Sequence, residues 1–383
     1  MILGLESSCD ETAVAVFDPA RGIVGEWVHS QIALHEVYGG VVPDLASREH
    51  LQHFGPLLQR ALVLLASRTP ASAITQIAVT RGPGLAACLA MGLATAKSLG
   101  LAWRVPVVGV NHLRAHAFSP FMALHAADPA NFDAALAKLL PHLGLLVSGG
   151  NTALFSLDEQ RCLRLISATM DDAAGEALDK GAKLLGLGYP GGPLVEQLAK
   201  SGNPTAFIFP KAVAQRMSLE FSFSGLKTSL RYTLEKMTAG EIELRRADLC
   251  ASYQRAVFEA LMRKTALALE RGVGRDRRPR RGEAATGDST TGSAIPPHNV
   301  EPGDVVLYRS FGLSGGVANN RTLQDGLGRV AAEHNVSFHR APLANTGDNA
   351  GMIAFAAWAE REPEGVSDAD LALEIAPSLP LAL

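Results

Sequence analysis

The sequence has few cysteines and no long hydrophobic run. Its 383 residues include four cysteines, which lie far apart and form no Cys-x-x-Cys pair. This spacing excludes a disulfide scaffold and a structural zinc site built from cysteine pairs, and it is typical of a reducing compartment. Lysine or histidine interrupts the Ala- and Leu-rich stretches, so none reaches the roughly 18 apolar residues that a membrane-spanning helix needs.

An excess of either charge is also missing. Lys and Arg number 35 and Asp and Glu number 38, which leaves a net charge of −3, while 47% of the residues are hydrophobic. The apolar fraction excludes a disordered or fibrous chain. A protein that coats nucleic acid is usually basic, so any such contact here must be local or shared with a partner. At about 100–200 residues per domain, the length predicts two domains or three.

The N-terminus lacks a targeting signal. Residues 1–6, MILGLE, enter an apolar strand at once and are followed by acidic residues. A signal peptide would need a basic start and a longer apolar stretch, and a transit peptide would need Arg and Ser without acidic residues. We therefore expect a soluble, cytoplasmic protein that does not contact a membrane.

Two segments 140 residues apart are similar to each other. Residues 3–18, LGLESSCDETAVAVFD, and residues 143–158, LGLLVSGGNTALFSLD, are identical at seven of sixteen positions. Each consists of an apolar strand, a turn of small polar residues and a second apolar strand, which predicts a β-hairpin. We expect a duplicated α/β domain whose two hairpin tips face each other across a cleft; chance similarity between two hairpins is the alternative.

Glycine-rich turns indicate phosphate binding. The tip Ser148–Gly150 presents backbone N–H groups without Cβ obstruction, so it can cradle an anion. A second such loop, residues 313–320, follows the apolar run Val305–Tyr308, which we expect to be a strand, and precedes a helical pattern. A strand, a Gly-Gly turn and a helix start favour an adenosine or phosphate site. Neither a Walker A nor a GxGxxG fingerprint stands in a usable context, which argues against P-loop and Rossmann folds.

A histidine pair indicates a metal centre. His112 and His116 are four residues apart, so on a helix they share one face and can ligate one transition metal; two surface histidines are the alternative. Leu113 follows His112, so the HExxH pattern of zinc peptidases is not met. Asp348, in a turn of small residues before the apolar helix expected at 352–358, is the best third ligand. Two histidines and one carboxylate suit Fe(II) or Zn(II).

Two further segments are polar. Within residues 171–180, Asp172, Glu176 and Asp179 are spaced to share one helical face, which either is simply solvated or binds ligand hydroxyls. Residues 272–303 are of low complexity and predict a disordered surface insertion. Six arginines against one aspartate within Arg271–Arg281 make its start basic. That loop can contact nucleic-acid phosphates, or it is a linker without function.

The chain resembles the TsaD family, the tRNA N6-adenosine threonylcarbamoyltransferases formerly called O-sialoglycoprotein endopeptidases. The resemblance runs in order from residue 2 to about residue 358 and is interrupted mainly by the 272–303 insertion. It is carried by the His112 and His116 pair and by the strings ESSCDET (6–12), YGGVVP (38–43), LVSGG (146–150), DDAAGEALDK (171–180), FSFSGLKT (221–228) and GGVANNR (315–321).

The resemblance implies a duplicated actin-like fold (the actin, sugar-kinase and Hsp70 class, ASKHA), with two domains around a central cleft. We expect the first domain to comprise residues 1–140 and 345–383, and the second residues 141–344 with the insertion inside it. The implied reaction moves the L-threonylcarbamoyl group from threonylcarbamoyl-AMP to N6 of adenosine 37, in tRNAs that read codons beginning with A. The implied partners are tRNA, a paralogous ASKHA subunit and a small ATPase.

The resemblance also assigns the site residues by matching position. Asp10 and Glu11 would lie near the reacting centre, where either could accept the amine proton. One Fe(II) per chain, with zinc as the alternative, would be held by His112, His116 and Asp348. The adenylate would be bound by Leu146, Val147, Ser148, Gly149, Gly150, Asp179, Gly192 and Asn320.

The sequence departs from the family pattern in three places. Asn151 stands where a histidine usually follows the Gly-Gly pair, Ala350-Gly351 reverses the usual order, and the arginine-rich insertion is extra. Two other functions remain alternatives on the same fold. A small-molecule kinase would use ATP and a catalytic Asp and would not need the histidine pair, and a metallopeptidase is disfavoured because HExxH is absent.

Overall fold

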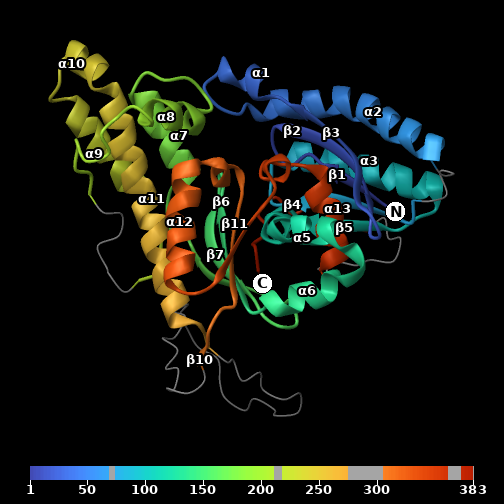
Figure 1. Cartoon of the computed structure of the whole chain (residues 1–383). Coiled ribbons are helices and arrows are strands. Elements are labelled where there is room, and N and C mark those ends of the chain that lie inside the picture. The colour runs from blue at the N-terminus through green and yellow to red at the C-terminus, as the bar shows by residue number, and fades with distance from the viewer. Residues whose placement is uncertain (69–73, 211–217, 275–304, 361–371, 383) are drawn as a thin grey trace, which may run out of the picture.

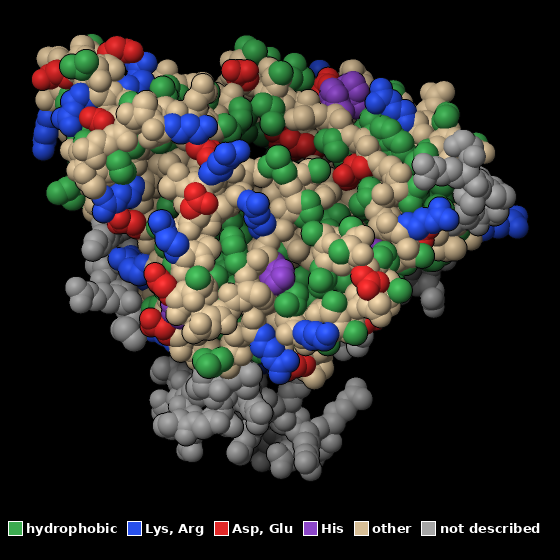
Figure 2. Space-filling view, viewed as in Figure 1, with side chains coloured by type: hydrophobic (Ala, Val, Ile, Leu, Met, Phe, Trp, Pro, Cys, Tyr) green, Lys and Arg blue, Asp and Glu red, His purple; other side chains and the backbone are tan. Residues whose placement is uncertain are grey.

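The computed structural model describes residues 1–68, 74–210, 218–274, 305–360 and 372–382. Figure 1 shows two sheet-centred halves side by side, and the helix near the C-terminus, α13, lies with the N-terminal half. The surface is hollowed between the two halves, and acidic side chains lie in the hollow (Figure 2). This arrangement agrees with the expected cleft.

The first half is built on a five-stranded sheet of order β3-β2-β1-β4-β5. β1 pairs antiparallel with β2 and parallel with β4, and β2 pairs antiparallel with β3. These strands are β1 (Ile2–Glu6), β2 (Glu11–Asp18), β3 (Gly22–Ser30), β4 (Gln76–Gly82) and β5 (Val107–Asn111).

The second half repeats this topology, with the order β8-β7-β6-β11-β12. β6 pairs antiparallel with β7 and parallel with β11, as β1 does with its own neighbours. The two similar sequence segments are therefore the first hairpins of two equivalent sheets, which confirms the predicted duplication. These strands are β6 (His142–Val147), β7 (Thr152–Leu157), β8 (Leu163–Ala168), β11 (Ser310–Ser314) and β12 (Ser337–Arg340).

Helices cover both faces of the first sheet. The helices of this half are α1 (Ile32–Glu36), α2 (Pro43–Arg68), α3 (Ala86–Trp103), α4 (His112–Phe118), α5 (Met122–Ala127), α6 (Phe132–Leu139) and α13 (Ala350–Ala359), with 3-10 turns η2 (Ser119–Phe121), η3 (Pro129–Asn131) and η5 (Leu343–Asn345). Leu3 and Leu5 share a core with α2 and α3, whereas α13 contacts β1 from the opposite face. Gly4 permits that contact, because a Cβ there would lie 2.3 Å from the Ala350 carbonyl oxygen. Successive residues of β1 face opposite sides of the sheet, so one side of β1 contributes to the core with α2 and α3 and the other side packs against α13.

The second sheet packs against a larger set of helices. They are α7 (Ala174–Leu184), α8 (Gly191–Ala199), α9 (Ser224–Leu234), α10 (Ala239–Leu244), α11 (Arg246–Arg271) and α12 (Arg321–Glu333), with the 3-10 turn η4 (Gly316–Asn319). α11 is the central element of this half, since it contacts α7, α8, α9 and α12. Its Tyr253 is fully buried and donates a hydrogen bond to the Ala177 carbonyl oxygen.

Three local predictions are corrected by the structure. The strand before the second glycine loop is β11 (Ser310–Ser314) rather than Val305–Tyr308, because the buried main-chain pairing begins only at Ser310. Asp172 precedes α7 and so does not share its helical face. The expected 272–303 insertion starts with paired residues: β9 (Val273–Gly274) pairs antiparallel with β10 (Val305–Val306). The remainder of that insertion, with its arginines from 275 to 281, lies outside the described residues.

One helix in the described part of the chain, α3, has the length and apolar composition that a membrane span requires. Core helices of globular domains have the same composition. α3 packs against β4 and α2, and Cys88, Leu89 and Ala96 on it are fully buried.

Candidate active site

Two histidines and one aspartate converge where β5 ends. α4 begins at His112, directly after β5, and the Asn111 side chain caps it by accepting hydrogen bonds from two backbone amides of the first turn. Asp348 lies in the turn before α13. Its Oδ1 is 3.4 Å from His112 Nε2 and 3.0 Å from His116 Nε2. The structure thus brings together the three residues that the sequence nominates as metal ligands.

A fourth charged side chain, Glu6, completes this cluster, although the sequence pattern assigned it no role. Glu6 ends β1 and is fully buried. Its Oε2 lies 3.0 Å from His112 Nδ1 and accepts a hydrogen bond from the Thr80 hydroxyl, while Oε1 accepts one from the Ser8 amide. This carboxylate holds the His112 ring so that Nε2 faces Asp348, as second carboxylates do behind histidine ligands in metal centres. In the sequence, a carboxylate at the end of an apolar, buried strand could have indicated this role, because such a group is rarely buried without a partner.

The cluster stabilises positive charge at its centre. Burial alone would raise the pKa of the Asp348 carboxyl, but the charge of His112 and hydrogen bonds from both histidines hold it well below its ordinary value. Burial would likewise lower the pKa of His112, but Asp348 and Glu6 raise it well above the usual range.

The donor set fits a divalent transition metal. Ligand atoms about 2.1 Å from a shared ion lie about 3.0 Å apart at right angles and about 3.4 Å apart at tetrahedral angles. The two separations from Asp348 Oδ1, 3.0 and 3.4 Å, are of the size expected for atoms that share one ion. Two imidazole nitrogens and one carboxylate oxygen are also the ligand types that such ions take in open catalytic sites.

The tip of the first hairpin lies beside this centre. Burial, and then the negative charges of Asp348 and Asp10, raise the pKa of Glu11 well above its ordinary value, so these carboxyl groups lie within electrostatic range of one another. Glu11 Oε1 also accepts a hydrogen bond from the Ser30 hydroxyl at 3.1 Å. Of the two residues that the sequence places near the reacting centre, Glu11 is therefore close to Asp348, and Asp10 is close to Glu11.

The tip of the second hairpin forms a closed turn. The Ser148 amide donates to the Asn151 carbonyl oxygen, and the Asn151 amide donates to the Ser148 hydroxyl. The Ser148 N–H is therefore already used within the turn. Gly149 and Gly150 are exposed and have open space where a Cβ would point. The side chains of the two preceding residues, Leu146 and Val147, are buried in the core, so these residues can offer only main chain to a ligand.

The second glycine-rich loop packs against this tip. Gly315 has φ +90°, and a Cβ there would lie 2.4 Å from the Val147 carbonyl oxygen. Asn320 is buried, caps α12 through a hydrogen bond from the Leu323 amide, and donates to Gln254 Oε1. The Thr346 hydroxyl donates to Asn319 Oδ1 at 2.8 Å. This bond joins the loop to the turn that carries Asp348.

We predict that alanine at Gly315 destabilises the protein, whereas alanine at the neighbouring Gly316 leaves its stability unchanged. Gly315→Ala should lower the melting temperature by several degrees, because a left-handed φ costs a non-glycine residue about 1–3 kcal/mol and the Cβ meets main chain as well. Gly316→Ala is the matched control, since it is exposed and has open space at its Cβ. Differential scanning calorimetry measures both; equal melting temperatures would contradict the close packing of this loop.

Asp179 and Gly192 meet at the start of α8. Asp179 Oδ1 accepts hydrogen bonds from the Gly191 amide at 2.8 Å and the Gly192 amide at 3.2 Å. Burial raises the pKa of Asp179, and these two bonds oppose the rise. A Cβ on Gly191 would overlap the Ala182 side chain, whereas Gly192 faces more open space. Of this pair, Gly192 is therefore the one that a ligand can approach.

Tyr189 is a candidate site residue that the sequence reasoning did not single out. Its pKa is raised first by burial and then by the negative charges of Asp10 and Asp179, so it lies within range of both halves of the site. It lies directly before the N-cap of α8, whose second residue is Gly192. In the sequence, its place in the glycine- and proline-rich turn YPGGP (189–193) could have indicated a role in the site.

The acidic segment before α7 is structural at its first two positions. Asp171 accepts hydrogen bonds from the Ser222 and Ser224 hydroxyls and from the Phe223 amide, so it anchors the start of α9. Asp172 pairs with Lys180 at 2.6 Å. The sequence suggested that Asp172, Glu176 and Asp179 bind the hydroxyl groups of a ligand. Of these three, Asp179 is the one that accepts hydrogen bonds from a glycine turn.

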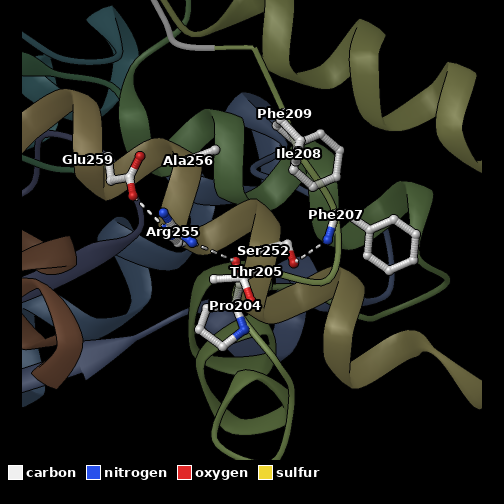
Figure 3. Close-up of a pocket in the computed structure, with 9 residues that line it drawn as sticks. All are labelled: Pro204, Thr205, Phe207, Ile208, Phe209, Ser252, Arg255, Ala256 and Glu259. Atoms are coloured by element: carbon white, nitrogen blue, oxygen red, sulfur yellow. Dashed lines mark hydrogen bonds and ion pairs between the residues drawn. The ribbon is translucent and has the colours of Figure 1, made fainter.

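A pocket of about 340 Å³ lies elsewhere, between the segment 204–209 and α11 (Figure 3). Its polar side chains bond to the protein itself. Arg255 pairs with Glu259, and the Ser252 hydroxyl accepts a hydrogen bond from the Phe207 amide. None of the site residues nominated by the sequence lines it.

Comparison with known proteins places the chain in a family. The family model for tRNA N6-adenosine threonylcarbamoyltransferase, TsaD, matches residues 22–355. Proteins named tRNA N6-adenosine threonylcarbamoyltransferase from Methylibium petroleiphilum and Variovorax paradoxus are each 40% identical over 388 residues. The alignments cover 100% of this chain and 98% and 96% of the two relatives.

A solved structure shows the same fold at low identity. HypF from T. kodakarensis is 15% identical, with a TM-score of 0.53, over 94% of this chain and 47% of that one. The two sheets of equal strand order and this likeness agree with the duplicated actin-like (ASKHA) fold. Together with the family match over most of its length and the relatives that span it completely, these findings show that the chain belongs to the TsaD family of tRNA N6-adenosine threonylcarbamoyltransferases.

Proposed function

We propose that this protein transfers the L-threonylcarbamoyl group from threonylcarbamoyl-AMP to N6 of adenosine 37, in tRNAs that read codons beginning with A. The observation that carries the proposal is the convergence of His112, His116 and Asp348 beside Glu11, in a chain of this family. A kinase on the same fold has no need of such a cluster, and the spacing of a zinc peptidase is absent.

In this proposal the adenylate binds between the glycine turns. The exposed amides of Gly149 and Gly150 donate to its phosphate, since main-chain N–H groups in such a turn form an anion-binding concavity. Asp179, Gly192 and Asn320 contact the nucleoside. Asp179 accepts hydrogen bonds from the Gly191 and Gly192 amides, which supports a role for the start of α8 in this contact.

His112 Nε2, His116 Nε2 and an oxygen of Asp348 would hold one Fe(II), or zinc in its place. When bound, the ion supplies a Lewis acid that polarises the threonylcarbamoyl oxygens. Glu6 keeps the His112 ring in the tautomer and orientation that this requires.

The transfer forms one bond and breaks one. N6 of adenosine attacks the carbamoyl carbon, the bond from that carbon to the phosphate oxygen breaks, and AMP leaves with the electron pair. The amine proton passes to Asp10 or Glu11.

Partners would share the work of holding tRNA. The net charge of −3 provides no bulk attraction for a polyanion, so we propose a paralogous ASKHA subunit and a small ATPase as partners in the cytoplasm. We also propose that residues 1–140 and 345–383 form one domain and residues 141–344 the other. The packing of α13 on β1 and β2 supports this division.

The test follows the leaving group. Purified chain, with partner subunits, unmodified tRNA and threonylcarbamoyl-AMP, should release AMP in a 1:1 ratio to threonylcarbamoyladenosine formed in the tRNA. A kinase would instead form ADP from ATP in the presence of a small-molecule acceptor. AMP release without any nucleoside product would contradict the assigned acceptor.

A further inference from the structure

The start of α13 lies on a row of small residues that has a carboxylate at its end. Pairing across the first sheet aligns Gly4 of β1, Ala15 of β2 and Glu26 of β3. Directly paired residues lie on the same face of a sheet. This face is the one that α13 covers (Figure 1), because a Cβ on Gly4 would meet the Ala350 carbonyl oxygen and Ala15 packs against the Ala350 side chain. Glu26 is the charged member of this row.

Glu26 forms a hydrogen bond with the main chain of α13. Its Oε1 accepts this bond from the Gly351 amide at 2.6 Å, across a sequence separation of 325 residues. The first amides of a helix have no acceptor within the helix, and the helix dipole favours a carboxylate at that end. The next amide along, that of Met352, is bonded to the Asn349 side chain. Glu26 therefore supplies a cap to α13 from a strand that is distant in the sequence.

Glycine at position 351 makes room for this bond. A Cβ there would lie 2.9 Å from Glu26 Oε1 and 2.9 Å from Ile23 Cδ1. Both contacts are with the ends of flexible side chains, so an alanine would push the carboxylate aside rather than move the strand. The order Ala350-Gly351, which departs from the family pattern, thus places the residue without a Cβ where Glu26 reaches the helix. The departure and the carboxylate form one structural feature.

The turn that carries Asp348 is bonded to this end of the helix. Asn349 Oδ1 accepts a hydrogen bond from the Met352 amide, and Asn349 Nδ2 donates one to the Gly347 carbonyl oxygen at 2.8 Å. These two bonds attach to main chain on either side of Asp348, so the turn shifts whenever the start of α13 shifts. Such a shift changes the separations of 3.4 and 3.0 Å between Asp348 Oδ1 and the two histidine nitrogens.

We propose that Glu26 is a positioning residue of the metal centre, whose hydrogen bond to Gly351 sets where α13 begins and so holds Asp348 at its distance from the two histidines. The inference rests on the proposed function for the existence of that centre. Glu26 acts through the main chain of α13 rather than by ligating the ion. Functional side chains must be held within about 0.5 Å of their productive geometry, so the loss of this cap is enough to weaken metal binding.

The test measures zinc affinity rather than activity. The full-length protein is stripped of metal and titrated with zinc in competition with a chromophoric chelator, and the centre is the equivalent that His116→Ala does not bind. Glu26→Ala should bind zinc there about tenfold more weakly than wild type, at the lower end of the loss typical of residues behind metal ligands. Glu26→Gln keeps an oxygen acceptor for the Gly351 amide and should stay close to wild type. Glu333→Ala removes an exposed carboxylate of α12 and is the control that should match wild type.

Gly351→Ala tests the same bond from the side of the helix. Its Cβ displaces the carboxylate, so zinc affinity should fall by a similar factor in the wild-type background. It should not fall further in the Glu26→Ala background, because residues that act through one contact are not additive. Additive losses would overturn the proposal. So would a Glu26→Ala protein whose melting temperature falls while its zinc affinity does not, since that result indicates a stabilising contact only.

These measurements separate the role of Glu26 from the proposed function. Equal zinc affinity in wild type and Glu26→Ala overturns the role of Glu26 and leaves the metal centre in place. Equal zinc content in wild type and His116→Ala overturns the centre itself and, with it, the role of Glu26.

Discussion

His116→Ala is expected to remove the metal from the cluster that it forms with His112 and Asp348 and to lower threonylcarbamoyl transfer by more than about 100-fold, beyond the 10–100-fold typical of second-shell losses. His116 is buried and its Nε2 lies 3.0 Å from Asp348 Oδ1, so no other described side chain can replace it without moving α4. The variant loses one of three ligands and leaves Asp348 with a single imidazole partner. Metal analysis by mass spectrometry and the initial rate of product formation measure both effects.

The control for this variant is another histidine outside the cluster. His339→Ala removes an imidazole on β12 that contacts the Ser337 hydroxyl, so metal content and rate should stay at wild-type values. A His116→Ala protein with full metal content and full rate would refute the ligand assignment.

Glu6→Gln is expected to weaken metal binding by about 10–100-fold without removing a ligand. Glutamine keeps the shape of the side chain and an oxygen for the Ser8 amide, but it loses the negative charge that faces His112 Nδ1 at 3.0 Å. Glu6 is a positioning residue, so excess metal should restore most of the transfer rate. A merely structural role would leave the rate low at every metal concentration.

Thr80→Val separates the charge of Glu6 from its hydrogen bonds. The Thr80 hydroxyl donates to Glu6 Oε2 at 2.6 Å, and valine removes that bond while the carboxylate stays. The loss in metal affinity should be smaller than for Glu6→Gln. Equal affinity in wild type and Glu6→Gln would show that Glu6 does not orient the histidine.

The duplicated sheets and the helix that carries the histidine pair could be predicted from the sequence. The similarity of residues 3–18 and 143–158 is a true structural repeat, because each segment forms the first hairpin of a sheet with the same strand order. The spacing of His112 and His116 predicted a shared helical face, which α4 provides. These features are local or periodic, so they can be recognised without knowledge of tertiary contacts.

The missed features depend on tertiary contacts. Glu6 becomes part of the metal cluster only because β1 and β4 lie side by side and α4 begins beyond them. Tyr189 acquires a place in the site through charges on two distant segments. The strand near the second glycine loop was misplaced because the apolar run Val305–Tyr308 is the stronger local signal, whereas pairing with β6 selects Ser310–Ser314.

Nucleoside analysis of tRNA tests the assigned transfer reaction most directly. Unmodified tRNA that reads a codon beginning with A is incubated with threonylcarbamoyl-AMP, the partner subunits and this chain, then digested and examined by mass spectrometry. We predict threonylcarbamoyladenosine with wild type and a loss of more than about 100-fold with Asp348→Ala, which removes the shared carboxylate ligand. No threonylcarbamoyladenosine with wild type, or equal amounts with both proteins, would contradict it.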